Sequence, residues 1–316
     1  MPEWAQQSYQ RYLQMKAMAH GGTRYTRQTA FQMPDWSGLW VFEADEGFAW
    51  DGVAVNKLAR GLGAQSAQAI LDHCQSFPCR GWVLGALTPR YAMRYREKLA
   101  AVTRNVEWDP VSDCLPPGFP RILIAPFGKE FIATPDETWA TALPMSEVRR
   151  IYTDGRGHTP ESEAFATWDG DSIGFWDGDT LVAHTLYLRA NELQRNQPDF
   201  SDQASVLERI RMRDPDTLED DTTLYDPVAL SAPWHAVHEY ARIITPHSQM
   251  DMWSCDPNIY QTKQGGTDLI LPGDSVTLQR DYRDPEDDQN FGLDRVREYG
   301  ARVLKAAPSS PGSQGR

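Results

Sequence analysis

Apolar and polar residues alternate between Phe165 and Leu188, and the alternation is interrupted at Asp177-Gly178. A period of two is typical of a β-strand, and an Asp-Gly pair readily takes the positive φ angles of a tight turn. The segment therefore predicts a β-hairpin. A turn centred on these two residues pairs Phe175 with Thr180, Ile173 with Val182, and Asp171 with His184. An aspartate and a histidine at the end of an apolar face either hold the strand end or form part of a functional site.

A second hairpin is predicted for Ser205 to Arg213 and Thr217 to Asp226, around Asp214-Pro215-Asp216. The predicted register pairs Met212 with Leu218, Ile210 with Asp220, Glu208 with Thr222, and Val206 with Leu224. Apolar residues agree on both strands, which supports this register. It also places Glu208 and Asp220 on the inward face. Two inward carboxylates are costly unless they are paired, hydrogen-bonded or protonated.

The remaining pattern predicts further strands and three helices. The strands are Trp36 to Phe42, Phe131 to Ala142, Val148 to Tyr152, Trp234 to Ile243 and a last one near Asp268 to Leu278. The helices are residues 2–19, 64–74 and 88–104. On Trp234 to Ile243, one face carries His235, Val237 and Glu239, and the other carries Trp234, His238, Tyr240 and Arg242. Alternation alone leaves open which of these faces points inward.

These elements indicate a mainly β protein with a single large domain. We expect an N-terminal helical arm at residues 1–34, a β domain at 35–302 with a helical insertion at 44–104, and a disordered tail at 303–316. A helical arm ahead of a β domain often packs on a second subunit, so we expect a homodimer. Five basic residues in the predicted helix 88–104 either form a solvated face or attract an acidic substrate.

Composition limits the partners of the chain. Its 316 residues carry a formal net charge of −13, which disfavours binding to nucleic acid or to an anionic membrane surface. No apolar run approaches the ~18 residues of a membrane helix, and the N-terminus lacks the apolar region of a signal peptide. Four cysteines without a CxxC pair do not indicate a disulfide framework. We therefore expect a cytoplasmic protein, unless a leader peptide has been removed.

Several segments together resemble a large bacterial family of uncharacterised sequences. They are CLPPGFPRILIAPFGKEFIATP, RRIYTDGR, SIGFWDGDTLV and VLERIRM, and they are similar to the family patterns C-x-PPG-x-PR, RxIYxDGR and SIGxWEGDTLVV. The resemblance covers about residues 87–260 and implies an antiparallel calycin-like (lipocalin-like) β-barrel. Gly38-x-Trp40 is similar to the G-x-W signature of such barrels. The chain departs from the family pattern at His184, Asp220 and His235, which add titratable groups.

The resemblance implies, as the nearest activity, a phenylcoumaran γ-formaldehyde lyase, which needs no redox cofactor. Such an enzyme would open the furan ring of a lignin-derived aromatic dimer and release formaldehyde to give a stilbene. Proton transfer requires a base and an acid. The candidates are His184 oriented by Asp171, with Glu208, Asp220 and His238 as further titratable groups. The candidate substrate contacts are Arg150, Tyr152, Trp176, Trp40, Tyr240 and His235, because aromatic and cationic side chains suit a phenolate ring.

Other functions have weaker support from the sequence. His235, His238, His247 and Asp251 carry metal-binding groups, but a regular strand points His235 and His238 to opposite faces, so we expect no metal site. There is no G-x-S-x-G, GxGxxG or P-loop, and Cys114 lies in a Pro-rich connector without an adjacent base. The competing hypothesis is a barrel that binds an aromatic or apolar ligand without chemistry. A structural or assembly role through the N-terminal arm is a third possibility.

Overall fold

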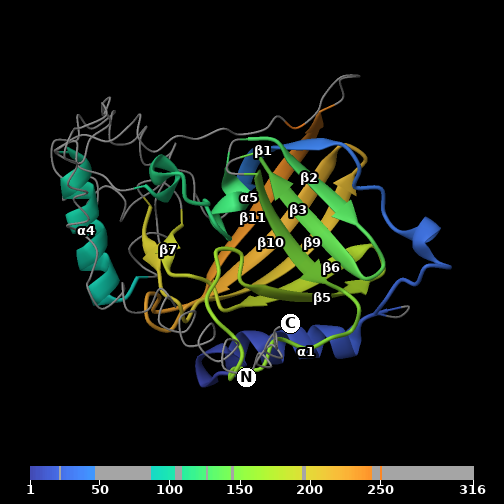
Figure 1. The fold of residues 1–316 in the computed structure, drawn as a ribbon, viewed down its shortest axis with the longest axis horizontal. Coiled ribbons are helices and arrows are strands. Elements are labelled where there is room, and N and C mark those ends of the chain that lie inside the picture. Colours follow the sequence, from blue (N-terminus) through green and yellow to red (C-terminus); the bar gives the residue numbers. More distant parts are fainter. Residues whose placement is uncertain are drawn as a thin grey trace, which may run out of the picture.

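The protein is a closed nine-stranded β-barrel with helical additions (Figure 1). The computed structural model describes residues 1–20, 23–46, 87–103, 109–125, 127–143, 146–193, 197–243 and 250. The barrel strands are β1 (Leu39–Glu46), β2 (Lys129–Ala133), β3 (Glu137–Ala142), β4 (Glu147–Tyr152), β5 (Asp171–Asp177), β6 (Thr180–Leu186), β9 (Ser205–Asp214), β10 (Thr217–Tyr225) and β11 (Trp234–Ile243). Their order around the barrel is β1-β11-β10-β9-β6-β5-β4-β3-β2.

The other described elements surround this barrel. They are the helices α1 (Gln6–Met18), α4 (Pro89–Thr103) and α5 (Arg121–Ile124), the 3-10 turns η1 (Glu3–Ala5), η2 (Ala30–Gln32) and η3 (Pro110–Asp113), and a small sheet of β7 (Asn191–Glu192) and β8 (Asp199–Phe200). In Figure 1, α1 crosses the barrel below β5 and β6, whereas α4 stands apart from it beyond β7.

The expected mainly β barrel is confirmed, and the helices predicted at 2–19 and 88–104 are present as η1 with α1 and as α4. One neighbouring pair departs from an antiparallel barrel, because β4 and β5 run parallel. The single strand predicted for Phe131 to Ala142 is wrong. A turn at 134–136 divides it into β2 and β3, since Pro135 has no N–H for a ladder and Thr134 closes the turn onto Glu137. The elements predicted at 64–74 and 268–278 and the tail 303–316 lie outside the described residues.

The two predicted hairpins have different outcomes. The register of β9 and β10 is confirmed, with Leu218 opposite Met212 and Asp220 opposite Ile210. The register predicted for β5 and β6 is wrong by two residues. The turn falls on Gly178, which has a φ of 64°, and on Asp179, so that Asp177 pairs with Thr180. His184 therefore faces Ile173, and Asp171 faces Leu186.

Strands β5 and β6 are buried on both faces because α1 covers their outer side. Tyr12 of α1 is 1% exposed and packs in an apolar cluster with Phe175, Val182 and Leu207. The buried positions of the N-terminal segment, Ala5, Ser8 and Tyr12, have the spacing of one helical stripe. In this chain the N-terminal arm thus packs on its own barrel, and the homodimer stays a prediction.

The barrel closes unevenly at β1. This strand pairs with β11 from Leu39 to Glu46, but with β2 only through Trp40 opposite Lys129. We call the region beyond that pair, between β2 and residues 34–38, the seam. The opposite end of the interior is filled by the connector before β2, because Phe119 and α5 belong to one apolar cluster with inward residues of β9, β10 and β11.

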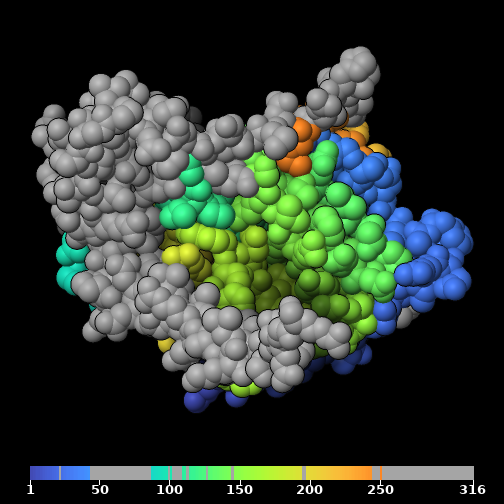
Figure 2. Space-filling model, in the orientation of Figure 1, coloured from blue at the N-terminus to red at the C-terminus, as the bar shows by residue number. Residues whose placement is uncertain are grey.

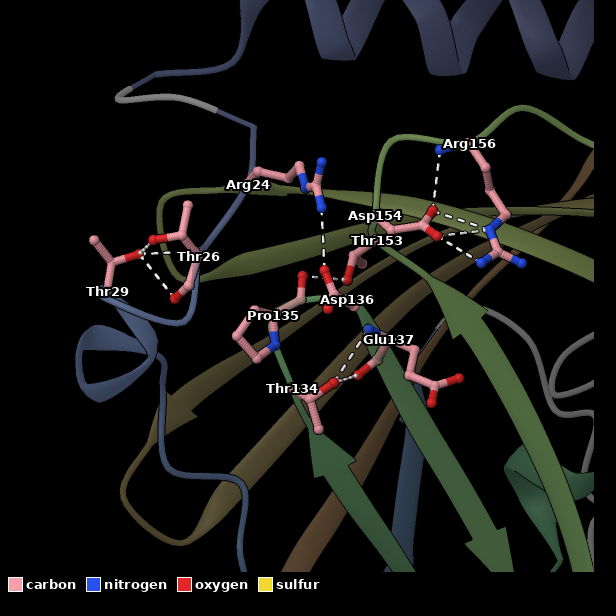
Figure 3. A network of polar contacts seen from close by, with 10 residues as sticks. All are labelled: Arg24, Thr26, Thr29, Thr134, Pro135, Asp136, Glu137, Thr153, Asp154 and Arg156. Atoms are coloured by element: carbon pink, nitrogen blue, oxygen red, sulfur yellow. Dashed lines mark hydrogen bonds and ion pairs between the residues drawn. The ribbon is translucent and has the colours of Figure 1, made fainter.

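The segment that follows α1 is fixed to the rim of the barrel (Figure 3). Arg24 donates a 3.0 Å hydrogen bond to Asp136 in the β2–β3 turn, and Thr153 Oγ1 donates to the carbonyl oxygen of Pro135. Asp154, in the turn after β4, accepts hydrogen bonds from Arg156. Figure 2 shows the N-terminal segment in blue against the green surface of β2 to β4. Both loops at this rim are thereby tied to neighbouring chain segments.

Two basic residues of α4 are neither solvated nor free to attract a substrate. Lys98 is 3% exposed and forms ion pairs with Glu192 and Asp199, at 2.6 and 2.8 Å. Arg94 also pairs with Asp199. Arg121 of α5 joins the same cluster through Glu192 and Asp109. These charges attach α4 to β7, β8 and the connector.

Cys114 is disulfide-bonded, and the other three cysteines lie outside the described residues. The cysteine spacing did not indicate this bond. Disulfides persist mainly in oxidising compartments, so the bond weighs against the expected cytoplasmic location, which stays a prediction. Among the described helices, none combines the length and apolar character needed to cross a membrane.

Replacing Tyr12 by alanine should lower the free energy of unfolding by about 3–5 kcal/mol, because it removes a buried aromatic ring from the interface between α1 and the barrel. Leu13, on the exposed side of the same helix, is the matched control, and Leu13→Ala should cost less than about 1 kcal/mol. Urea unfolding curves of the three proteins test this. Equal costs for the two variants would show that α1 is not anchored through Tyr12.

Candidate functional site

Arg149 of β4 is buried inside the barrel and donates four hydrogen bonds. Its guanidinium donates two hydrogen bonds to the Glu208 carboxylate, Nη1 to Oε1 at 2.8 Å and Nη2 to Oε2 at 2.5 Å. It also donates to Thr185 Oγ1 at 2.9 Å and to Ser172 Oγ at 3.3 Å. The ring of Phe119 lies over it, with 3.6 Å between Cζ and the ring centroid. Glu208 is therefore a paired carboxylate and not a free acid.

Asp220 lies on the next strand of the interior and is 1% exposed. Thr222 Oγ1 donates to its Oδ1 at 3.0 Å, and its Oδ2 has no hydrogen-bond partner among the described residues. Burial and the nearby carboxylate of Glu208 raise the pKa of Asp220 well above its ordinary value, against the smaller opposing effect of Arg149. These effects favour the protonated form of the Asp220 carboxyl group, which can donate a hydrogen bond.

Two further titratable side chains face the interior near Asp220. His238 lies directly opposite it on β11, and Tyr240 follows on the same face. Burial raises the pKa of Tyr240, and its hydroxyl has no partner among the described residues. Burial, together with the charges of Lys129 and His235, lowers the pKa of His238 to about 3. A carboxyl group with a raised pKa, a neutral imidazole and a phenol therefore lie side by side.

Aromatic rings form a continuous series from Tyr240 to the seam. The ring centroids of Tyr240 and Phe131 are 5.8 Å apart, those of Phe131 and Trp36 are 6.2 Å apart, and those of Trp36 and Trp176 are 5.2 Å apart. The indole nitrogens of Trp36 and Trp176 are buried and have no partner among the described residues. A pocket of about 300 Å³ lies over Trp36 and Phe131, and it is lined by Pro34, Asp35, Trp36, Ser37, Gly38, Glu130, Phe131, Ile132 and Ala133.

The size of this pocket is at the lower end of the range for small-molecule sites. Its floor consists of rings that also belong to the interior aromatic cluster. The seam pocket therefore borders the aromatic cluster of the barrel interior.

A separate chain of hydrogen bonds lies on the outer side of the barrel, beneath α1. Asp171 Oδ2 is 3.1 Å from His158 Nδ1, and His158 Nε2 is 2.8 Å from His184 Nδ1. His184 Nε2 is 2.9 Å from Ser8 Oγ, which in turn lies 2.7 Å from Ser205 Oγ. We call these five residues the outer relay. It connects the loop before β5 to α1 and β9.

The relay is screened from water by rings. Tyr9 and Tyr12 of α1 lie 5.5 and 5.7 Å from the ring of His184, which is 0% exposed. Burial lowers the pKa of His184 well below its ordinary value, and the nearby His158 adds to this effect. Burial alone would raise the pKa of Asp171, but the hydrogen bonds from His158 and the Thr159 amide lower it. Both pKa shifts favour a neutral His184 imidazole and an ionised Asp171 carboxylate at neutral pH.

The structure divides the predicted site residues into an inner and an outer group. Those that face the interior are Glu208, Asp220, His238, Tyr240, Trp176 and Trp40. Those on the outer side are His184, Asp171, Arg150, Tyr152 and His235. His184 and Asp220 are therefore not brought together, and the expected pairing of His184 as base with an interior carboxylate is not formed.

Three of the outer residues have partners of their own. Arg150 lies over Trp139, at 4.3 Å between Cζ and the ring centroid, and the Tyr152 ring is covered by Arg156. His235 pairs with Asp221. His235 and His238 face opposite sides of β11, as expected, while His247 and Asp251 lie outside the described residues.

Several important residues were missed by the sequence analysis. Arg149 and Lys129 carry charge on inward faces, and strand alternation could have found Arg149, since it has the opposite parity to Arg150 on β4. His158 and Ser8 lie in a loop and on α1. No periodic pattern relates those two segments to β6.

A search of protein-family models and of curated proteins found no match to this chain. Its function is therefore argued from the arrangement of its side chains.

Replacing Glu208 by glutamine should lower the free energy of unfolding by about 3–5 kcal/mol, because the buried Arg149 charge loses its partner. Glu219 pairs with Arg211 near the surface of the same hairpin, and Glu219→Gln should cost about 1 kcal/mol or less. Chemical unfolding of both variants makes the comparison. A small cost for Glu208→Gln would mean that Arg149 finds a second partner.

His184 should contribute a pH-dependent part of the stability. Because its pKa is lowered in the folded state, the unfolded chain binds a proton at this residue more readily than the folded chain. The stability that neutral His184 provides is thus present above about pH 6.5 and is lost as the pH falls, by up to about 1.4 kcal/mol per pH unit. The stability advantage of the wild type over His184→Gln should therefore shrink between pH 7.5 and 5.

Urea unfolding at several pH values measures this difference. His20→Gln is the control, because the His20 side chain is 95% exposed and lies outside the outer relay. A pH-independent difference between the wild type and His184→Gln would contradict the assigned neutral state.

Proposed function

We propose that the protein is a cofactor-independent enzyme that acts on an aromatic small molecule by proton transfer inside the barrel. The observation that carries this proposal is the buried Asp220 carboxyl group, which has an oxygen without a partner among the described residues and whose pKa burial raises well above its ordinary value. Buried polar groups are nearly always hydrogen-bonded, so an oxygen of this kind favours a role toward a bound molecule. Perturbed acids in enclosed sites are typical of catalytic centres.

The surroundings of Asp220 suit a phenolic ligand. Tyr240 retains its proton because burial raises its pKa, so its hydroxyl can donate to a phenolate oxygen. The interior rings of Trp176, Trp36 and Phe131 offer flat apolar surface for stacking. Arg149 donates two hydrogen bonds to Glu208, and these bonds connect β4 to β9 across the interior.

The specific reaction that we propose is the one implied by the family resemblance, the cleavage of a phenylcoumaran. The electron pair of the substrate phenolate opens the furan ring, the ring C–O bond breaks, and the departing oxygen takes the proton of Asp220. The ionised Asp220 then takes the proton of the hydroxymethyl group as its C–C bond breaks. Formaldehyde leaves, and the electron pair of that bond forms the stilbene C=C and restores the phenolate. Asp220 ends protonated, so neither oxidant nor reductant is consumed.

A non-catalytic barrel that binds an aromatic ligand is the second candidate. This candidate is favoured by Trp36 and Phe131 in the lining of the seam pocket. It is also favoured by the two hydrogen bonds from Arg149 to Glu208, which make Glu208 a paired carboxylate and not a free acid. Saturable quenching of tryptophan fluorescence by a phenylcoumaran, without formaldehyde release, would support it over the enzyme.

Asp220→Asn should lower kcat/KM for a phenylcoumaran by about 100-fold or more, because asparagine keeps the shape of the protonated acid but cannot transfer a proton. Trapped formaldehyde and the stilbene absorbance measure turnover. The matched control is Asp221→Asn, since Asp221 is the next residue, faces outward and pairs with His235. Equal activity of the two variants would remove Asp220 from the reaction.

A further inference from the structure

The protein contains two buried lysines in contrasting environments. Lys98 and Lys129 are each 3% exposed. Lys98 has two carboxylates within 2.8 Å, and these raise its pKa although burial alone would lower it. Lys129 has no carboxylate partner among the described residues. A buried ammonium without a counter-ion is costly, so the neutral amine is favoured at this position.

The hydrogen bonds of Lys129 fit a neutral amine. Its Nζ lies 2.5 Å from the carbonyl oxygen of Ala125 and 3.3 Å from that of Phe127. A neutral amine has two N–H groups, and these two acceptors can take both. The lone pair of the nitrogen then remains unused. Burial lowers the pKa of Lys129 to about 7, so a large fraction of the amine is neutral at physiological pH.

The position of Lys129 places this amine beside aromatic surface. Among the described residues, Lys129 and Trp40 form the one pair that joins β1 to β2, and Lys129 lies on the same face of β2 as Phe131, which lines the seam pocket. Its Nζ is 5.5 Å from the centroid of the Tyr240 ring. The seam pocket is lined by Glu130 and Phe131, which follow Lys129 directly on β2, although Lys129 itself does not line it.

We propose that Lys129 is a carbonyl-reactive amine that holds an aromatic aldehyde as an imine. The lone pair of Nζ bonds to the carbonyl carbon, the carbonyl oxygen leaves as water with both amine protons, and a C=N bond forms. No oxidant or reductant is needed. The site is independent of proton transfer by Asp220, and either can exist without the other.

Reductive trapping tests this inference. The full-length protein is incubated at pH 7 with 4-hydroxybenzaldehyde and cyanoborohydride, which reduces an imine to a stable secondary amine, and the labelled lysines are identified by peptide mass spectrometry. At this pH about half of an amine with a pKa near 7 is neutral, against roughly one part in 2,500 of an ordinary lysine.

Label at Lys129 should therefore exceed label at the partly exposed Lys16 by about ten-fold or more. Lys98 should stay unlabelled, because it is equally buried but ion-paired. Equal label at Lys129 and Lys16, or none at Lys129, would overturn the proposal.

Two further arms complete the test. Lys129→Arg keeps a donor for the two carbonyl groups but has no nucleophilic amine, and it should lose the label while its circular dichroism spectrum is unchanged. If that variant does not fold, the ratio of Lys129 to Lys98 label in the wild type still decides the question. Label from formaldehyde but not from the aromatic aldehyde would overturn the assigned ligand class.

Discussion

The buried ion pair between Arg149 and Glu208 is the constraint on which the rest of the structure depends. Such a pair adds little net stability, but a missing partner leaves an uncompensated charge in the interior. Arg149 donates four hydrogen bonds to acceptors on β5, β6 and β9, and Phe119 of the connector lies over its guanidinium. Phe119, Arg149, Ser172 and Glu208 come from four segments that are far apart in the sequence. These separated stretches of sequence meet around one guanidinium group.

The same ion pair sets the chemistry of the interior. Burial and the charge of nearby Glu208 raise the pKa of Asp220 well above its ordinary value, against the smaller opposing effect of Arg149. The outer relay forms a second polar system on the opposite face of the same sheet, where α1 excludes water from His184. The barrel wall separates the two systems. The outer relay attaches α1 to the barrel. The interior contains the Asp220 carboxyl group, whose pKa is raised.

The sequence could predict those parts of the fold that depend on local pattern. The register of β9 and β10 was correct because a three-residue turn and apolar partners on both strands agreed. The register predicted for β5 and β6 was wrong, because Gly178 can occupy either central position of a tight turn. Both faces of this hairpin are buried, so the alternation of polar and apolar residues could not distinguish the two registers. The relay depends on His158 and Ser8, which come from distant segments. Only the packing of α1 and of the loop before β5 brings them to His184.

The protonation state of Asp220 is the central claim, and infrared difference spectroscopy between the wild type and Asp220→Asn at pH 7 tests it most directly. Other buried acids with raised pKa values, such as Glu147 and Glu192, are present in both proteins and cancel in the difference. The account predicts that the wild type has one additional C=O stretching band of a protonated carboxylic acid, which the variant lacks. A difference spectrum with a carboxylate band in place of that acid band would contradict it.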